Sequence, residues 1–369
     1  MAMMRLGYFS LLVCLCFLSA SPSTRAASTH QHLFTSTHPA MGTTYSLFVY
    51  TSDARRAKQL SDDVWDEIDR IEDLLSNYRE TSELSRINHL AADAPITTDP
   101  ETFRFLSEAQ HWSSTSNGAF DITVGKLMRA WGFFRSSGHI PSDAELATVR
   151  QETGWEKMRL EPENRSVRFL SPGLELDPGG IGKGFAVNAA AAILRREGVR
   201  SALLSAGSST LYAIGAPPHR TGWRVVVPDP VQGNPPLSVI FLRDESVSSA
   251  NCTEKNFILN GHLYCHIMDP STLRPVEGML RVSVIHPNAT ASDALSNVVF
   301  VKRPGESLKV LARSAPQSRA IIVSGDSSNP TCTVFRWTAK LSPRCGPAQH
   351  AEIPTLSSRS AAKGSASRY

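Results

Sequence analysis

The stretch from Leu176 to Gly184 reads Leu-Asp-Pro-Gly-Gly-Ile-Gly-Lys-Gly and combines closely spaced glycines with one lysine. Glycines let backbone amides approach a ligand, and a helix that begins after them presents unpaired N–H groups and partial positive charge. An apolar stripe through Ala186, Ala190 and Leu194 predicts such a helix from about Phe185 to Glu197. The loop could therefore hold a phosphate. It is neither a Walker A sequence nor a well-placed dinucleotide fingerprint, so an ordinary tight connection is the alternative.

A second candidate site is the pair Asp293 and Asn297, which lie four residues apart. Ser292 could cap a helix here, which would place Asp293 in the first turn and both side chains on one face. Their oxygens suit a hard cation such as Mg²⁺, which takes one or two such groups and completes its shell with water and substrate phosphates. The alternative is an acidic residue favoured by the helix dipole alone.

Two further loops could hold a planar ligand. Tyr78 follows a stretch from Leu60 to Leu75 whose apolar residues recur at helical spacing, which predicts an amphipathic helix. A second helix, predicted over residues 102–116, is broken by the turn Gly118-Ala-Phe-Asp121, which sets an aromatic ring beside a carboxylate. The alternatives are that Tyr78 is an ordinary surface aromatic and that the turn is a common packing feature.

The second half of the chain is predicted to be rich in strands. Alternating or continuous apolar runs predict strands at Val199–Ala206, Leu211–Ile214, Trp223–Val227, Ser238–Leu242 and Arg281–His286. Asn260-Gly261 predicts a two-residue turn between two further strands of a hairpin.

Four cysteines outside the N-terminal region allow two disulfides in an oxidising compartment, with three connectivities. Pairing of Cys332 with Cys345 is favoured. The predicted hairpin register sets Cys265 opposite Asn256 rather than Cys252, so a bridge between Cys252 and Cys265 would need a bulge.

The N-terminus has the order of regions of a secretory signal. Met1–Arg5 precedes an apolar run from Leu6 to Ala20 and a zone of small residues, which predicts a signal peptide over residues 1–26. We therefore expect an exported, periplasmic protein; an uncleaved anchor, which would associate it with the inner membrane, is the alternative.

Composition sets the remaining limits. The chain has 369 residues and a net charge of +4 spread without basic runs, so nucleic acid is not expected as a partner. The Ser/Ala/Arg-rich residues 348–369 predict a disordered tail. The residues between signal and tail could form one large domain or two tightly joined halves.

Together these segments resemble the ApbE family, the FAD:protein FMN transferases, over roughly residues 33–325. The matching pieces occur in the family's order: Met41-Gly-Thr43, Ser76-Asn-Tyr78 with Ser82-Glu83 and Asn88, Gly118-Ala-Phe-Asp121-Ile-Thr-Val-Gly125 with Trp131-Gly-Phe, Leu176-Asp177 to Lys183-Gly184, Tyr264-Cys-His266-Ile-Met-Asp269-Pro270 and Ser292-Asp293-Ala-Leu295. The resemblance implies a T-fold-like α/β (α+β) single domain over residues 33–337, with mixed antiparallel sheets packed by helices.

The resemblance also implies a function. It is that of an enzyme that uses Mg²⁺ and FAD to attach FMN through a phosphoester bond to a Thr or Ser of an exported acceptor protein, with release of AMP. Carried over residue by residue, it implies three sets: cofactor contacts at Met41, Tyr78, Ala119, Phe120, Asp121, Asp177, Gly179, Lys183, His266 and Ile267; metal ligands at Asp293, Asn297 and the carbonyl of Gly182; and catalytic candidates His266, Asp269 and Lys183.

Four positions depart from the family's usual residues. Asn297 replaces Thr, Asn188 replaces Asp, and Ser208 and Leu273 replace Gly. If positions 208 and 273 need positive φ, the flavin pocket would be reshaped. These departures motivate one alternative, an exported FAD-binding carrier without transferase activity. A second alternative is a Mg²⁺-dependent FAD pyrophosphatase, which differs from the transferase only in using water as the acceptor. The chain contains no acceptor segment of the type Asp-Gly-x-Ser/Thr-x-Ala-Thr, so self-modification is not expected.

Overall fold

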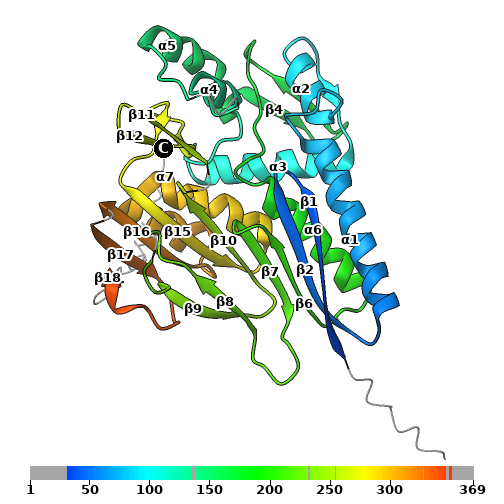
Figure 1. Cartoon of the computed structure of the whole chain (residues 1–369). Helices are drawn as coiled ribbons and strands as arrows, with labels where there is room; N and C mark the ends of the chain where they lie inside the picture. Colours follow the sequence, from blue (N-terminus) through cyan, green and yellow to red (C-terminus); the bar gives the residue numbers. More distant parts are fainter. Residues whose placement is uncertain are drawn as a thin grey trace, which may run out of the picture. The chain divides into compact units, whose positions relative to one another are not determined.

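An antiparallel sheet organises the computed structural model, which describes residues 31–134, 138–231, 233–253, 255–326, 328–345 and 349–350. Within these ranges the sheet has nine strands in the order β1-β2-β6-β7-β10-β15-β16-β17-β18 (Figure 1). Their bounds are β1 His32–Ala40, β2 Thr43–Thr51, β6 Ser201–Ala206, β7 Thr210–Gly215, β10 Ser246–Asn251, β15 Met279–His286, β16 Arg319–Asp326, β17 Asn329–Phe335 and β18 Gln349–His350. Only the last pair in this sheet is parallel.

Three helices cover one face of the sheet. Helix α1 (Ala54–Leu75) lies against β1 and β2, α6 (Gly182–Arg196) against β6 and β7, and α7 (Ala289–Ser314) against β10 and β15 (Figure 1). The opposite face is covered by the hairpin of β8 (Trp223–Val227) and β9 (Ser238–Leu242). Both faces of β6 are therefore buried, which explains why four of its six residues are apolar.

The remaining elements surround these layers. They are α2 Glu83–Leu90, α3 Pro100–Thr115, α4 Gly125–Ala130, α5 Asp143–Glu152, the short 3₁₀ turns Trp155–Lys157 and Pro343–Cys345, and the strands β3 Ile96–Thr97, β4 Met158–Glu161, β5 Ser166–Phe169, β11 Asn256–Leu259, β12 His262–Cys265, β13 Met268–Asp269 and β14 Arg274–Pro275. The predicted class of antiparallel sheets packed by helices is confirmed.

Two helices begin earlier than the sequence predicts. Helix α6 starts at Gly182 rather than near Phe185, so the last glycines of the loop form its first turn. Helix α7 starts at Ala289, because the Asn288 side chain accepts a hydrogen bond from the amide of Ala291 at 2.9 Å and caps the helix. The prediction that Ser292 caps this helix is wrong.

Both disulfides join cysteines thirteen residues apart. Cys332 pairs with Cys345 as predicted, and Cys252 pairs with Cys265. The hairpin register is also as predicted, with Cys265 opposite Asn256. The expected bulge is not required, because Cys252 precedes the hairpin and approaches Cys265 from the end of β10.

The folded chain continues beyond residue 337, where the sequence analysis ended the domain. A short 3₁₀ turn holds Cys345, and β18, which falls inside the predicted tail, pairs with β17. The predicted signal peptide and the rest of the tail lie outside the described residues. Within the described ranges, no helix combines the length and the apolar character that a membrane crossing needs.

Leu273 adopts the left-handed backbone conformation that glycine favours, with φ of 60°. Its side chain is only 1% exposed and packs with Trp131 and Met268, while its carbonyl accepts a hydrogen bond from the Trp131 indole at 3.0 Å. Ser208, the other residue that replaces a family glycine, does not have positive φ; the preceding Gly207 does. Burial of the leucine offsets the backbone strain at position 273.

We expect Leu273→Gly to destabilise the protein. The variant relieves strain worth about 1–2 kcal/mol, whereas truncating a buried leucine costs about 2–5 kcal/mol. The free energy of unfolding, measured by urea denaturation, should fall by about 1–3 kcal/mol. Asn260→Gly is the matched control, because Asn260 also has positive φ but lies exposed at the hairpin turn. A Leu273→Gly variant as stable as wild type would contradict this explanation.

Candidate functional site

A cavity of about 640 Å³ is formed by segments that are far apart in the sequence. It is lined by the turn Met41–Thr43, the loop Ser76–Arg79, the turn Ala119–Ile122, the glycine-rich loop from Asp177 to Lys183, the segment His266–Met268, and single residues that include Lys255 and Asn297. Its volume lies within the range of about 300–1,000 Å³ that is usual for small-molecule sites.

Most of the predicted site residues meet at this cavity. Its wall includes Met41, Tyr78, Ala119, Phe120, Asp121, Asp177, Gly179, Gly182, Lys183, His266, Ile267 and Asn297. Two predicted residues are not in the lining. Asp293 is buried directly behind the glycine-rich loop, and Asp269 uses its carboxylate to accept hydrogen bonds from the amide and hydroxyl of Ser271.

The glycine-rich loop and helix α7 are joined by a backbone contact. The amide of Gly184, in the first turn of α6, donates a hydrogen bond of 2.8 Å to Oδ2 of Asp293. A Cβ atom at position 184 would lie 2.4 Å from the carbonyl oxygen of Ala289, so only glycine allows this approach. One of the amides that could have bound a phosphate is therefore used to hold Asp293.

Asp293 is a buried carboxylate beside the Lys183 charge. Burial raises its pKa to about 6, and the Lys183 ammonium, the Gly184 amide and the Thr210 hydroxyl act in the opposite direction. Lys183 and Asp293 are 110 positions apart in the sequence, yet the charge of the lysine acts on the carboxylate. The two candidate sites predicted from the sequence thus lie next to each other.

Buried hydroxyls behind Asp293 were not identified from the sequence. Thr210 is within 3.0 Å of Ser248, and Ser248 is within 2.7 Å of Ser292, measured between side-chain oxygens. Ser292 is therefore part of the support of α7 instead of its cap. Serine and threonine scattered over two strands and a helix carry no local signal that they will meet.

Asn297 ties the glycine-rich loop to α7. Its side-chain amide donates to the carbonyls of Gly180 and Asp293, both at 3.1 Å. Within the loop, Asp177 accepts a hydrogen bond from the amide of Gly179 at 2.8 Å, and burial raises the pKa of this carboxylate. The loop is thus held in shape by side chains on both sides.

Asp121 fixes the turn that carries Phe120. Its carboxylate accepts hydrogen bonds from the amide and hydroxyl of Thr123 and from the amide of Trp155, at 2.7–2.9 Å. Burial raises the pKa of Asp121 to about 6, and these donors act against that rise. The structure therefore gives this residue a role in shaping the cavity wall.

Tyr78 stands at the edge of the cavity with a large exposed surface. The residue is 65% exposed, and its ring centroid lies 5.2 Å from that of Phe134. The guanidinium carbon of Arg129 lies 4.3 Å from the centroid of the Phe134 ring. Arg129 is held by an ion pair with Glu175 at 2.6 Å. An aromatic ring supported from behind and open in front is suited to stack on a planar ligand.

His266 and Lys255 are joined beside the cavity. His266 Nδ1 lies 2.7 Å from the carbonyl oxygen of Lys255, so the neutral ring carries its proton on Nδ1 and its lone pair on Nε2. Lys255 was not singled out from the sequence. A lone lysine in a loop carries no motif, and only the fold brings it to the cavity.

The match to known proteins is extensive. A family model described as the ApbE family matches residues 41–322. The chain belongs to the ApbE family. It is similar to the FAD:protein FMN transferase of Salmonella typhimurium, with 28% identity over 293 residues, 78% of this chain and 83% of that protein.

Solved ApbE structures share the fold. The ApbE protein of Thermotoga maritima is 27% identical, with a TM-score of 0.73 over 80% of this chain and 96% of that one. The flavinyl transferase ApbE of Pseudomonas stutzeri is 25% identical, with a TM-score of 0.74 over 83% and 95% of the two chains.

The ApbE resemblance implies a metal, and the buried carboxylate fits one. Asp293 is 3% exposed and burial raises its pKa to about 6, so a bound cation would stabilise its ionised form. Among the described residues no three His, Cys, Asp or Glu side chains cluster, so a site built from several such ligands is not present there. One carboxylate, the Asn297 amide oxygen and a carbonyl suit Mg²⁺ better than a metal that demands many protein ligands.

We expect Asp121 to lower the stability of this ApbE protein as the pH rises from about 4 to 6. The folded state keeps its proton in this window while the unfolded state releases it, so ionisation favours unfolding. Over this range the free energy of unfolding of wild type relative to Asp121→Asn should fall by about 1–3 kcal/mol. Urea denaturation of both proteins at several pH values measures the difference. A difference that is constant with pH would contradict the raised pKa.

Proposed function

We propose that this protein is a Mg²⁺-dependent FAD:protein FMN transferase that attaches FMN to a Thr or Ser of an exported acceptor protein and releases AMP. The observation that carries the proposal is that Lys183 and the glycine-rich loop line one cavity, while Asp293 lies directly behind the loop and accepts a hydrogen bond from its Gly184 amide. The names of its relatives support the flavin substrate and a protein acceptor.

The reaction is a phosphoryl transfer, which depends mainly on positioning and on neutralising charge at the phosphate oxygens. The acceptor oxygen attacks the phosphorus of the FMN half of FAD, and the bond to the AMP phosphate breaks. AMP leaves with the electron pair of that bond, and the acceptor hydroxyl loses its proton to a base. Lys183 and the loop amides orient the diphosphate. Asp293, Asn297 and the Gly182 carbonyl would hold Mg²⁺, which supplies positive charge beside it.

His266 is the better placed of the two candidate bases. It lines the cavity, and the Lys255 carbonyl holds the tautomer that carries a lone pair on Nε2. Asp269 is outside the cavity lining, and its carboxylate is engaged with Ser271. We therefore assign the acceptance of the acceptor proton to His266.

The proposed location is the periplasm. Two disulfides fit an oxidising compartment, and the N-terminal sequence has the pattern of an export signal. The acceptor is then an exported protein. Contact with the membrane would come only through the acceptor or through an uncleaved signal anchor.

The deciding experiment follows the flavin products. Purified protein is incubated with FAD, Mg²⁺ and an acceptor domain from the same organism that carries the Asp-Gly-x-Ser/Thr-x-Ala-Thr segment. Mass spectrometry should find FMN on the acceptor together with AMP. Release of FMN and AMP without acceptor modification would identify a pyrophosphatase instead, and intact bound FAD would identify a carrier.

We expect Asp293→Ala to lower the rate of AMP release on the order of 100-fold, because the variant removes the charge that would hold the cation. It should also abolish any rise in melting temperature that Mg²⁺ causes in wild type. Asp62→Ala is the control, since Asp62 is exposed on α1 and pairs with Lys58 one helical turn away. Unchanged AMP release and Mg²⁺ stabilisation in the Asp293 variant would refute the assigned metal site.

We expect Tyr78→Ala to weaken FAD binding roughly 5- to 30-fold, since stacking on an aromatic ring is worth about 1–2 kcal/mol. Quenching of tryptophan fluorescence, followed with EDTA present so that FAD is not consumed, gives the dissociation constant. Tyr78→Phe keeps the ring and should bind FAD nearly as wild type does. Equal losses in both variants would contradict a stacking role.

A further inference from the structure

Lys255 brings a second cation to the cavity from a different part of the chain than Lys183. It follows β10, lines the cavity, and donates a hydrogen bond of 3.3 Å from Nζ to the hydroxyl of Tyr78. Its charge lowers the pKa of Asp177, in the glycine-rich loop, against the effect of burial. Lys255 therefore lies within electrostatic reach of both the loop and the aromatic edge of the cavity.

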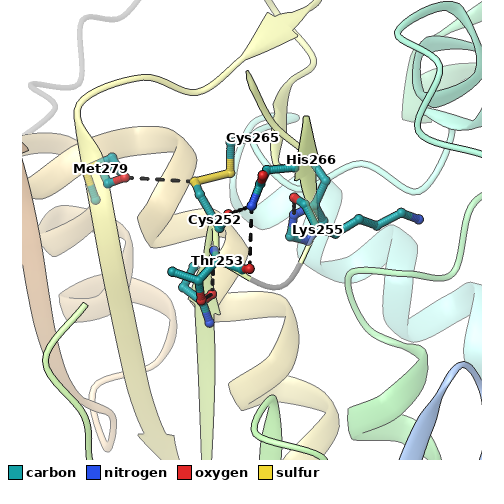
Figure 2. Close-up of a disulfide and its surroundings, with 8 residues drawn as sticks. Cys252, Thr253, Lys255, Cys265, His266 and Met279 are labelled. Atoms are coloured by element: carbon teal, nitrogen blue, oxygen red, sulfur yellow. Dashed lines mark hydrogen bonds between the residues drawn. A yellow bond between two sulfur atoms is a disulfide. The ribbon is translucent and has the colours of Figure 1, made fainter. Parts of the chain in front are cut away.

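A disulfide anchors the turn that carries this lysine. Cys252 lies three residues before Lys255 and is bonded to Cys265, which directly precedes His266. The Lys255 carbonyl in turn accepts from Nδ1 and from the amide of His266, at 2.7 and 3.3 Å. Figure 2 shows the disulfide on one side of this contact and the Lys255 side chain extending away from it.

Local hydrogen bonds also support the described residues beside Lys255, because the Asn256 side-chain amide donates to the Cys252 carbonyl at 2.6 Å. The hairpin β11–β12 packs one face on the aromatic cluster of Trp131 and Phe133, but its other face exposes Ile258 by 68% and Leu263 by 46%. Lys255 precedes the first hairpin strand and belongs to neither β10 nor β11. The disulfide is the covalent link between this turn and the His266 segment of the cavity wall.

We propose that Lys255 is a further binding residue for the diphosphate of FAD and that the Cys252–Cys265 disulfide is its positioning element. This inference rests on the proposed function, because it takes FAD as the ligand. On binding, the ammonium would exchange the Tyr78 hydroxyl for a phosphate oxygen, a stronger charge-assisted partner. A turn already fixed by a disulfide loses less conformational entropy when it binds, which favours affinity.

The first test separates phosphate from flavin recognition. Dissociation constants of FAD and of riboflavin, which has the flavin ring but no phosphate, are measured by fluorescence with EDTA present. Lys255→Gln should weaken FAD binding on the order of 10-fold and leave riboflavin binding unchanged. Lys255→Arg should restore most of the FAD affinity. Equal loss for both ligands, or no loss for FAD, would overturn the assignment.

The second test separates positioning from general stability. The double variant Cys252→Ala/Cys265→Ala should weaken FAD binding by a factor close to that of Lys255→Gln. Adding Lys255→Gln to it should have little further effect, because two changes that act through one contact are not additive. The matched control is Cys332→Ala/Cys345→Ala, which opens a disulfide of the same sequence separation away from the cavity and should leave FAD affinity unchanged.

The outcomes distinguish this inference from the proposed function. Equal affinities in wild type and in the Cys252→Ala/Cys265→Ala variant, or a fully additive effect of Lys255→Gln, would overturn the positioning role. A different outcome is that wild type binds FAD with the expected dependence on Lys255 but never modifies an acceptor. That outcome would contradict the transferase proposal but not this inference. Wild type that binds no FAD would overturn both.

Discussion

The contact between the Gly184 amide and the Asp293 carboxylate is the constraint on which the site depends. It requires the first turns of α6 and α7 to meet almost backbone to backbone, and only glycine at position 184 permits that distance. Helix α6 lies on β6 and β7, and α7 lies on β10 and β15. The contact therefore joins two helices that are packed on different parts of the sheet. Fold and site share this one packing requirement.

Two buried carboxylates, one in the cavity wall and one directly behind it, differ in how the protein stabilises them. Asp121 and Asp293 both have pKa values raised to about 6 by burial, yet their partners differ. Asp121 receives three hydrogen bonds from the protein and shapes a turn. Asp293 accepts a hydrogen bond from the Gly184 amide and lies beside the charge of Lys183, and we propose it as a ligand of a cation brought with the substrate. The same residue type thus acts as a structural support in one place and as a candidate ligand in the other.

The departures from the family's usual residues are accommodated by packing. Leu273 keeps the backbone conformation of a glycine because its side chain is buried against Trp131 and Met268. Asn297 uses its amide to tie Gly180 to α7. Neither substitution disrupts the cavity, so neither favours the loss of transfer chemistry over its retention.

Local patterns in the sequence determined the amphipathic helix α1, the hairpin register around Asn260-Gly261 and the pieces that mark an ApbE protein, since each depends on residues close together in the chain. The start of α7 was predicted wrongly because Asn288 caps the helix in place of Ser292. Only the tertiary structure placed Lys255 at the cavity and Asp293 beside Lys183. Contacts across long separations are decided by which faces the core buries, and a single sequence carries no local trace of that choice.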